Sequence, residues 1–397
     1  MKIVYITHFF SPAACVASIN TYRIVKGLAD RGHELIVLCP QTFSKYTPIQ
    51  LQNKNQPYPF EVHHFSPTPL PLSIAVPHLF NALRALKHGY DAIITQFHLF
   101  HLASFMGFPL KTLKRKPWVI KVHDMIYDPA VPTLVSGKAF INSCFAALLK
   151  ASYGVFLKNL GKKADKVFVA TRELRNLLLR NGHLPDKVAV IPNGVDTQIF
   201  KPSTSKGNCA KKKTVLYIGS MLPEDGLRSL VRAFALLDRE KELNLTLIGN
   251  GPERLPLMEL VKKLNLEKTV TFHKHVPHEL IPNFIREAYL TVGQLGLSLI
   301  NSYGIPVKIL EYFACGKPVV SAPASRDILI DGFTGLVVRN PTPKNIAEKF
   351  SIMMEDEKLM AKMGKNARRL VVEKFDWEKI INRMEKEIQD VGSHRFN

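Results

Sequence analysis

The sequence predicts an α/β protein made of two Rossmann-like domains that face each other across a cleft, and three observations lead to this prediction. Short apolar runs alternate with helical patterns, the alternation lapses once near the middle of the chain, and it then starts again. The 397 residues, 46% of them apolar, are enough for two domain cores. Because strands that alternate with helices form parallel sheets covered on both faces, we expect one such sheet in each half.

The first half is expected to begin with a buried strand, Ile3–Thr7, followed by a helix over Tyr22–Arg31 that stops at Gly32. Further short apolar runs are predicted as strands: Glu34–Cys39, Ala92–Gln96, Trp118–Val122, Lys166–Ala170 and Val188–Ile191. A first domain over residues 1–195 follows from this pattern.

The polar stretch Asp196–Lys213 interrupts the pattern and is predicted as a linker. The second domain, residues 214–375, is expected to contain these strands: Val215–Ile218, Leu243–Ile248, Val270–Phe272, Leu290–Val292, Val319–Ser321 and Leu336–Val338. Residues 376–397 are predicted as a final helix, Asp376–Gln389, with its tail.

The charge balance indicates an anionic partner. The chain has 54 Lys and Arg against 33 Asp and Glu, a formal net charge of +21. Nucleic acid, an acidic membrane surface and phosphorylated substrates would each suit such a balance, but no nucleic-acid-binding motif accompanies it. Two basic stretches interleaved with apolar residues, Lys111–Lys121 and Lys138–Lys166, favour an anionic membrane surface, and buried helices with solvated lysines are the alternative.

The five cysteines are scattered and none has a partner at C-x-x-C spacing. This pattern argues against a disulfide framework and a structural zinc site, and it favours a cytoplasmic location. No apolar run is long enough for a membrane-spanning helix, and the first residues are interpreted as a buried strand rather than a signal peptide. We expect no metal and no bound cofactor.

The richest candidate site is the segment Tyr303–Pro318. Gly304, Ile305 and Pro306 precede a helix that Gly316 is expected to end, with Pro306 in its first turn. Lys308 would add a cation to the positive end of this helix, and Glu311 lies three residues later on the same face. This arrangement suits a phosphate beside sugar hydroxyls, and an ordinary surface ion pair is the alternative.

Two strand-end turns and one strand-end histidine complete the candidates. Gly219 with Ser220, and Gly249 with Gly251, follow predicted strands and would let a ligand approach the backbone closely. His123 and Asp124 follow the strand Trp118–Val122, where a histidine could exchange a proton near neutral pH, and a structural histidine is the alternative.

Taken together, these motifs resemble the retaining glycosyltransferases of family 4, which have the GT-B fold. The resemblance covers nearly the whole chain and is strongest in four segments: Gly27–Glu34, Val190–Asp196, Leu247–Pro252 and Lys308–Val320. It implies transfer of a sugar from a nucleoside-diphosphate donor with retention and without a metal, and a last helix that crosses back to the first domain. It also implies that Glu311 binds the ribose and that His123 contacts the donor sugar.

Many family members act on lipid-linked acceptors at the inner membrane face, so the resemblance implies a glycan or lipid-linked acceptor.

Three positions depart from the family pattern. Tyr303 stands where many members have a second glutamate, and Ser220 and Asp225 stand where many have basic residues. Lys308 is then expected to carry the diphosphate, as in a subset with a Pro-x-Lys-x-x-Glu pattern. A sugar-nucleotide epimerase or hydrolase, and a catalytically weak membrane-associated binding protein, are the alternatives.

Overall fold

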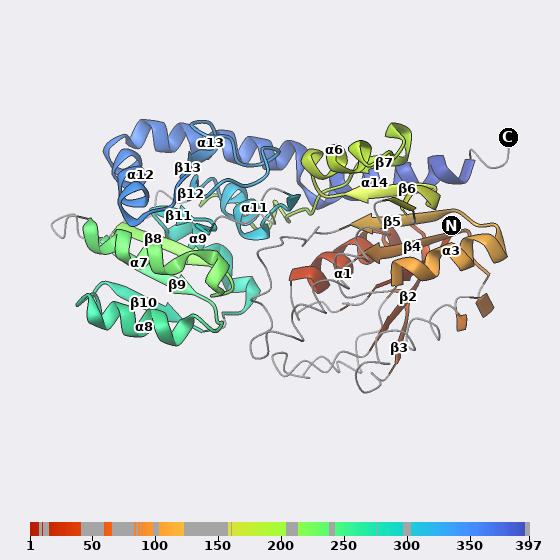
Figure 1. Cartoon of the computed structure of the whole chain (residues 1–397), viewed down its shortest axis with the longest axis horizontal. Coiled ribbons are helices and arrows are strands. Elements are labelled where there is room, and N and C mark those ends of the chain that lie inside the picture. Colours follow the sequence, from red (N-terminus) through yellow and green to blue (C-terminus); the bar gives the residue numbers. More distant parts are fainter. Residues whose placement is uncertain are drawn as a thin grey trace. The chain divides into compact units, whose positions relative to one another are not determined.

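The computed structural model describes residues 1–7, 10, 16–40, 59–65, 83–84, 86–87, 89–97, 103–122, 158–159, 161–203, 213–237, 243–274, 276–296 and 303–393. These residues form two compact units (Figure 1). The first contains residues 1–193 together with 377–397, and the second contains residues 194–376. The fold class predicted from the sequence, two parallel α/β sheets covered by helices, is confirmed.

The first unit is built on a seven-stranded parallel sheet in the order β3-β2-β1-β4-β5-β6-β7. Its strands are β1 (Lys2–Ile6), β2 (Glu34–Pro40), β3 (Glu61–Phe65), β4 (Ala92–Phe97), β5 (Trp118–Val122), β6 (Lys166–Val169) and β7 (Val188–Val190). Its described helices are α1 (Val16–Ala29), α3 (Ala103–Lys114), α5 (Gly161–Lys163), α6 (Arg172–Arg180) and α14 (Trp377–Ser393), with a 3₁₀ turn at Pro185–Lys187.

The last helix, α14, belongs to the first unit although it follows the second in sequence. Its apolar face lies in one core with α1 and the first sheet; the α14 side chains buried there are Ile380, Ile381, Met384 and Ile388. Polar contacts fix its position, because Glu385 lies 2.8 Å from the imidazole of His33 and Asn382 accepts hydrogen bonds from Arg31. The first unit therefore needs this distant segment to complete its core.

The second unit is built on a six-stranded parallel sheet in the order β10-β9-β8-β11-β12-β13. Its strands are β8 (Lys213–Ile218), β9 (Leu243–Ile248), β10 (Val270–His273), β11 (Leu290–Val292), β12 (Val319–Ser321) and β13 (Gly335–Val337). Its described helices are α7 (Leu227–Leu236), α8 (Arg254–Lys263), α9 (Ile281–Glu287), α11 (Val307–Ala314), α12 (Pro343–Glu355) and α13 (Glu357–Lys374), with 3₁₀ turns at Pro223–Asp225 and His278–Leu280.

Alternate side chains of the second sheet enter two different cores. Val215 and Tyr217 pack with α7, α8 and α12 on one face. Leu216 packs with α9, α11 and the later part of α13 on the other face. This period of two is what a parallel strand buried on both faces requires, and it explains why these strands appear in the sequence as nearly continuous apolar runs.

Two elements differ from the sequence prediction. Helix α1 begins at Val16, six residues before the predicted start, because buried Ser18, Asn20 and Thr21 occupy its inner face and break the apolar pattern. Strand β3 was not predicted, since its Glu-Val-His-His-Phe sequence at the sheet edge has no apolar run.

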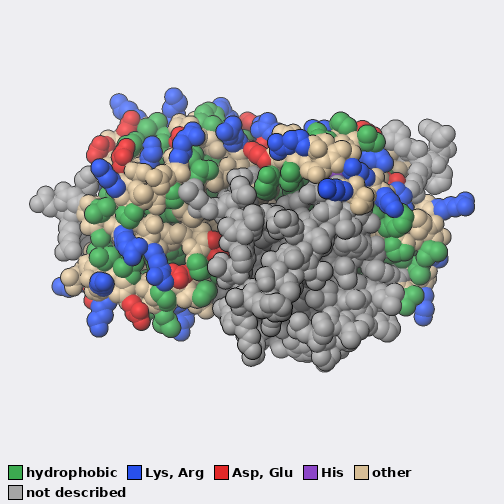
Figure 2. All heavy atoms as spheres, in the orientation of Figure 1, with side chains coloured by type: hydrophobic (Ala, Val, Ile, Leu, Met, Phe, Trp, Pro, Cys, Tyr) green, Lys and Arg blue, Asp and Glu red, His purple; other side chains and the backbone are tan. Residues whose placement is uncertain are grey.

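No helix in the described ranges is long and apolar enough to cross a membrane. Lys and Arg side chains are scattered over the described residues on the face that Figure 2 shows.

Candidate functional site

The site predicted around Tyr303–Pro318 lies in the second unit, at the point where the order of its strands reverses. Strand β8 has β9 on one side and β11 on the other, so the loops that leave β8 and β11 diverge to opposite sides of the sheet. In open α/β sheets, ligands bind at the carboxyl ends of the strands at such a point. Gly219 and Ser220 follow β8, and Gly249 and Gly251 follow β9, at this same edge.

Packing between the loops explains why glycine occurs at these positions. A side chain on Gly249 would place its Cβ 1.8 Å from the carbonyl oxygen of Gly219, and one on Gly251 would approach the carbonyl oxygen of Met221 to 2.4 Å. Gly219 and Gly249 also have φ angles of +152° and +143°, which other residues rarely adopt. The two turns therefore form one closely packed backbone surface that a ligand can approach.

Lys308, in the first turn of α11, extends over Gly219. Its Nζ donates a hydrogen bond of 2.8 Å to the hydroxyl of Tyr217, which in turn donates to the carbonyl oxygen of Ser220 at 2.7 Å. The Lys308 side chain is only 13% exposed. Burial lowers the pKa of Lys308 to about 8, and the nearby carboxylates of Asp225 and Glu311 partly oppose this shift. The cation is therefore held at the glycine turns with a charge that titrates just above neutral pH.

Asp225 is the buried counter-charge of this site. One of its carboxylate oxygens lies 3.8 Å from Lys308 Nζ and accepts a hydrogen bond from the Gln294 side chain. The other accepts from the Ser220 hydroxyl and from the backbone N–H of Leu222. Asp225 thus ties the loops that follow β8 and β11 together. It also raises the pKa of Tyr217 further, although burial is the main cause of that increase.

Glu311 lies one helical turn beyond Lys308 and is also mostly buried, with 9% of its side chain exposed. Its Oε1 lies 2.8 Å from Nε2 of His278, whose ring stands 5.3 Å from that of Phe200. Lys308 and Glu311 thus have different partners, so the alternative of a simple surface ion pair between them is wrong. The second carboxylate oxygen, Oε2, has no hydrogen-bond partner among the described residues and can accept from a ligand hydroxyl.

Helix α11 itself is anchored by its core side chains, which leaves its first turn available. Ile309, Leu310, Tyr312 and Phe313 are fully buried, and the Tyr312 hydroxyl accepts the N–H of Ile218 at the end of β8. Gly316, at φ +73°, ends the helix as predicted. Pro306 is the N-cap residue rather than a residue of the first turn, and no side chain caps this helix start. The first N–H groups of α11 therefore remain available to donate hydrogen bonds to an anion.

Of the five remaining predicted site residues, the structure describes Tyr303, Gly304 and Ile305. Tyr303 and Gly304 precede α11 at the same loop, partly buried and buried respectively. The Ile305 side chain is 3% exposed inside the apolar core, so only its backbone can face a ligand. His123 and Asp124 lie outside the described residues, and their predicted role stays a prediction.

The structure adds side chains that the sequence did not single out. Tyr217, Gln294 and His278 come from three different segments, and only the fold brings them beside Lys308, Asp225 and Glu311. No spacing rule connects residues this far apart in the chain. The resulting arrangement combines a cation, free amide groups, an accessible carboxylate oxygen and exposed backbone. It can bind an anionic group and hydroxyl groups of one ligand simultaneously.

Both halves of the chain match family models. A model described as glycosyl transferases group 1 matches residues 201–370, and one described as glycosyltransferase family 4 matches residues 17–199. An uncharacterized glycosyltransferase of Methanocaldococcus jannaschii is 21% identical over 97% of each chain.

Solved structures share the fold along the whole chain. The structure of sucrose-phosphate synthase from Thermosynechococcus elongatus has a TM-score of 0.77 at 21% identity and covers 99% of both chains. The structure of Anabaena HepE in complex with UDP has a TM-score of 0.74 at 20% identity and covers 98% of this chain and 100% of that one. With two matching family models and this fold, the chain belongs to the family-4-like glycosyltransferases of the GT-B type.

Proposed function

We propose that this glycosyltransferase transfers a hexose from a nucleoside-diphosphate donor to a glycan or lipid-linked acceptor, with retention of the anomeric configuration and without a metal. One observation carries the proposal. Lys308 and Glu311 stand one turn apart at the start of α11, beside the packed glycine turns at the strand-order reversal. The HepE structures with UDP and with UDP-glucose support a nucleotide-sugar donor, since that protein shares this fold.

In this proposal Lys308 and Glu311 bind neighbouring parts of the nucleoside diphosphate, the diphosphate and the ribose. Lys308 and the free N–H groups of α11 bind the diphosphate, where the positive helix end adds to the ammonium charge. The free Oε2 of Glu311 accepts hydrogen bonds from the ribose hydroxyls, while His278 holds Oε1 in place. The turns at Gly219 and Gly249 allow the nucleotide to contact the backbone.

The reaction breaks the bond between the anomeric carbon and the diphosphate oxygen and forms one between that carbon and an acceptor oxygen. The nucleoside diphosphate leaves with the bonding electron pair, and the acceptor hydroxyl passes its proton to the oxygen of this leaving group. Negative charge therefore grows on the diphosphate, and Lys308 with the α11 amides stabilises this charge in the transition state. His123 is proposed to contact the donor sugar, as the family resemblance implies, and the neighbouring Asp124 is proposed as a second catalytic residue.

The proposal includes a cytoplasmic location at an anionic membrane surface, where lipid-linked acceptors are accessible. The net charge of +21 supports it. In the stretch Lys111–Lys121, the structure exposes Lys114 and Arg115 but buries Lys121 within β5, so only the first part of that stretch can meet a membrane. Most of the stretch Lys138–Lys166 lies outside the described residues.

Asp225 favours a second candidate, a GT-B protein that binds its donor but turns it over weakly. The Asp225 carboxylate offsets the charge of Lys308, so this pair contributes no net positive charge toward a diphosphate. The two candidates differ in turnover rather than in binding.

A two-stage experiment tests the proposal. Thermal shifts with uridine, guanosine and adenosine diphosphates identify the base, since a ligand at a hundredfold excess over Kd stabilises by about 2.7 kcal/mol. The matching sugar nucleotides, labelled in the sugar, are then incubated with membrane and glycan extracts. Label transfer that Glu311→Ala abolishes supports the glycosyltransferase. Binding without any transfer favours the weak binding protein, and no thermal shift with any diphosphate rejects the donor site.

A further inference from the structure

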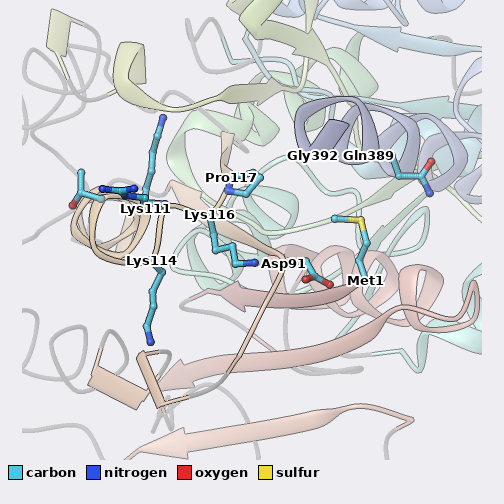
Figure 3. Close-up of a pocket in the computed structure, with 10 residues that line it drawn as sticks. Met1, Asp91, Lys111, Lys114, Lys116, Pro117, Gln389 and Gly392 are labelled. Carbon is cyan, nitrogen blue, oxygen red and sulfur yellow. The ribbon is translucent and has the colours of Figure 1, made fainter. Parts of the chain in front are cut away.

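A cavity lies in the first unit, away from the carboxyl ends of its strands. It has a volume of about 910 Å³ and is bordered by Met1, Asp91 and Pro117 (Figure 3). These residues directly precede β1, β4 and β5, so the cavity opens at the amino edge of the parallel sheet. The proposed donor site belongs to the other unit, so this cavity is not part of the donor site.

Basic side chains surround the cavity, and two of them are not neutralised. Lys111 pairs with Asp165 at 2.8 Å and donates to the carbonyl oxygen of Lys163. Lys114 and Lys116 also border the cavity, and neither has a hydrogen-bond or ion-pair partner in the described part of the chain. They extend in different directions from the end of α3, with Lys116 directed toward Asp91 and Met1 (Figure 3).

The acidic lining residue, Asp91, does not cancel this charge fully. One of its carboxylate oxygens accepts the backbone N–H of Lys2 at 2.8 Å, which ties Asp91 to the start of β1. Besides Lys111, which pairs with Asp165, the lining contains Lys114, Arg115 and Lys116, so three further basic residues stand against one acid. The positive potential of these side chains would attract an anion into the cavity.

Much of the wall is apolar. Met1 and Pro117 are apolar lining residues, and Gly392 of α14 adds a stretch of wall without a side chain. Leu113, next to these basic residues on α3, is 68% exposed. Apolar walls combined with a cationic rim suit an amphiphile whose anionic group stays near the lysines.

We infer that this cavity binds a phosphate ester carried on an apolar body, with Lys116 contacting the phosphate, Lys114 adding positive charge at the border, and Met1 and Pro117 contacting the apolar part. Two sources share this chemistry, an anionic phospholipid of a membrane and a soluble phosphate ester. The volume is within the range of about 300–1,000 Å³ that is usual for small-molecule sites.

The test measures binding to the full-length protein by calorimetry and by vesicle flotation. The probes are inorganic phosphate, dihexanoyl phosphatidylglycerol below its micelle concentration, and vesicles with and without phosphatidylglycerol. The double variant Lys114→Ala/Lys116→Ala is expected to weaken binding of the short-chain lipid by at least about tenfold, since each lysine near an anionic lipid is worth about 1 kcal/mol. The matched control, Lys379→Ala/Lys386→Ala, removes two exposed lysines of α14 that do not border the cavity.

A second variant blocks the cavity without changing its charge. A Cβ on Gly392 would meet no atom closer than Met1 Cε at 3.9 Å, so Gly392→Phe can be accommodated at its backbone and its ring would fill part of the space. We expect it to abolish binding of the short-chain lipid. The melting temperature of each variant without any ligand reports on folding and is expected to stay near that of the original protein.

The probes separate the two sources. If the double variant also loses flotation with anionic vesicles, the ligand is a membrane lipid, and if only the short-chain lipid is affected, it is a soluble ester. The inference is overturned if both cavity variants bind the short-chain lipid like the control. Equally tight binding of inorganic phosphate and lipid would overturn the apolar part of the assignment.

Discussion

The proposed donor site depends most on Lys308, because its ammonium group is the cation that stands beside the carboxylates of Asp225 and Glu311. Its ammonium group is held over Gly219 by the Tyr217 hydroxyl and lies 3.8 Å from Asp225. Burial lowers its pKa to about 8, which is close to neutral pH. The charge that a diphosphate would meet is therefore sensitive to small changes in pH and in the surrounding residues.

The pH dependence of donor binding follows from this pKa. Below pH 8 Lys308 is charged and attracts the diphosphate, and above pH 8 the free protein loses this charge. We expect affinity for nucleoside diphosphate, measured by calorimetry, to fall about tenfold between pH 7 and pH 9. Lys308→Arg is the matched control, since arginine stays charged throughout and its profile should be flat. The same decrease in that variant would assign the titration to another group.

Asp225 should set the position of this pH profile. Its carboxylate raises the pKa of Lys308, against the larger effect of burial. In Asp225→Asn, which keeps the shape of the side chain, we expect the midpoint of the same affinity profile to move below pH 8. A midpoint that stays in place, or rises, would show that Asp225 does not act on Lys308.

At the scale of elements, the site depends on the packing of the loops after β8 and β9. Gly249→Ala would force a Cβ to 1.8 Å from a backbone oxygen of Gly219, at a φ angle that alanine rarely adopts. We expect a loss of about 2–4 kcal/mol in the free energy of unfolding, measured by urea denaturation.

Gly89→Ala provides the control for this loop substitution. No atom lies within 4 Å of the added Cβ there, and its φ is not positive. A change of less than about 0.5 kcal/mol is expected for it. If both variants lose equal stability, the close packing of the two turns is not what requires glycine.

The same elements show what can be predicted from a sequence. Strands buried on both faces, such as Trp118–Val122 and Leu243–Ile248, were predicted with their observed bounds because their apolar runs end at turn residues. Helix α11 and its glycine stop were predicted from local signals as well. The edge strand β3 and the start of α1 were missed, because their residues satisfy polar or edge positions rather than a periodic apolar face.

For the site, local sequence identified the helix that carries Lys308 and Glu311 but not the partners of these side chains. The pairing of Lys308 with Tyr217 and Asp225 joins residues 83 to 91 positions apart, and His278 reaches Glu311 from the far end of another loop. Such contacts follow from the strand order, which the sequence pattern alone does not specify.

At the scale of the whole chain, the last helix makes the first unit discontinuous. Met384 of α14 is fully buried in the core with α1, and Lys386 two residues later is exposed. We expect Met384→Ala to destabilise the protein by about 2–5 kcal/mol and Lys386→Ala to leave it within about 0.5 kcal/mol. Differential scanning calorimetry with and without nucleoside diphosphate is the suitable measurement.

The ligand should distinguish the two units in that experiment. Since the proposed donor site lies in the second unit, nucleotide should still stabilise the Met384→Ala protein as much as the original, while the early part of the unfolding transition moves to lower temperature. Loss of the nucleotide response in this variant would mean that donor binding requires an intact first core.

The proposed donor site is tested most directly by comparing a nucleoside diphosphate with its nucleoside in calorimetric titrations of the original protein and Lys308→Ala. If Lys308 binds the diphosphate and Glu311 the ribose, the variant should lose about 10–100-fold in affinity for the diphosphate, because a charge-assisted hydrogen bond contributes about 1.5–3 kcal/mol. Its weaker affinity for the nucleoside should be unchanged. Equal losses for both ligands, or no loss for either, would remove Lys308 from the phosphate-binding role and with it the main support for the donor site at α11.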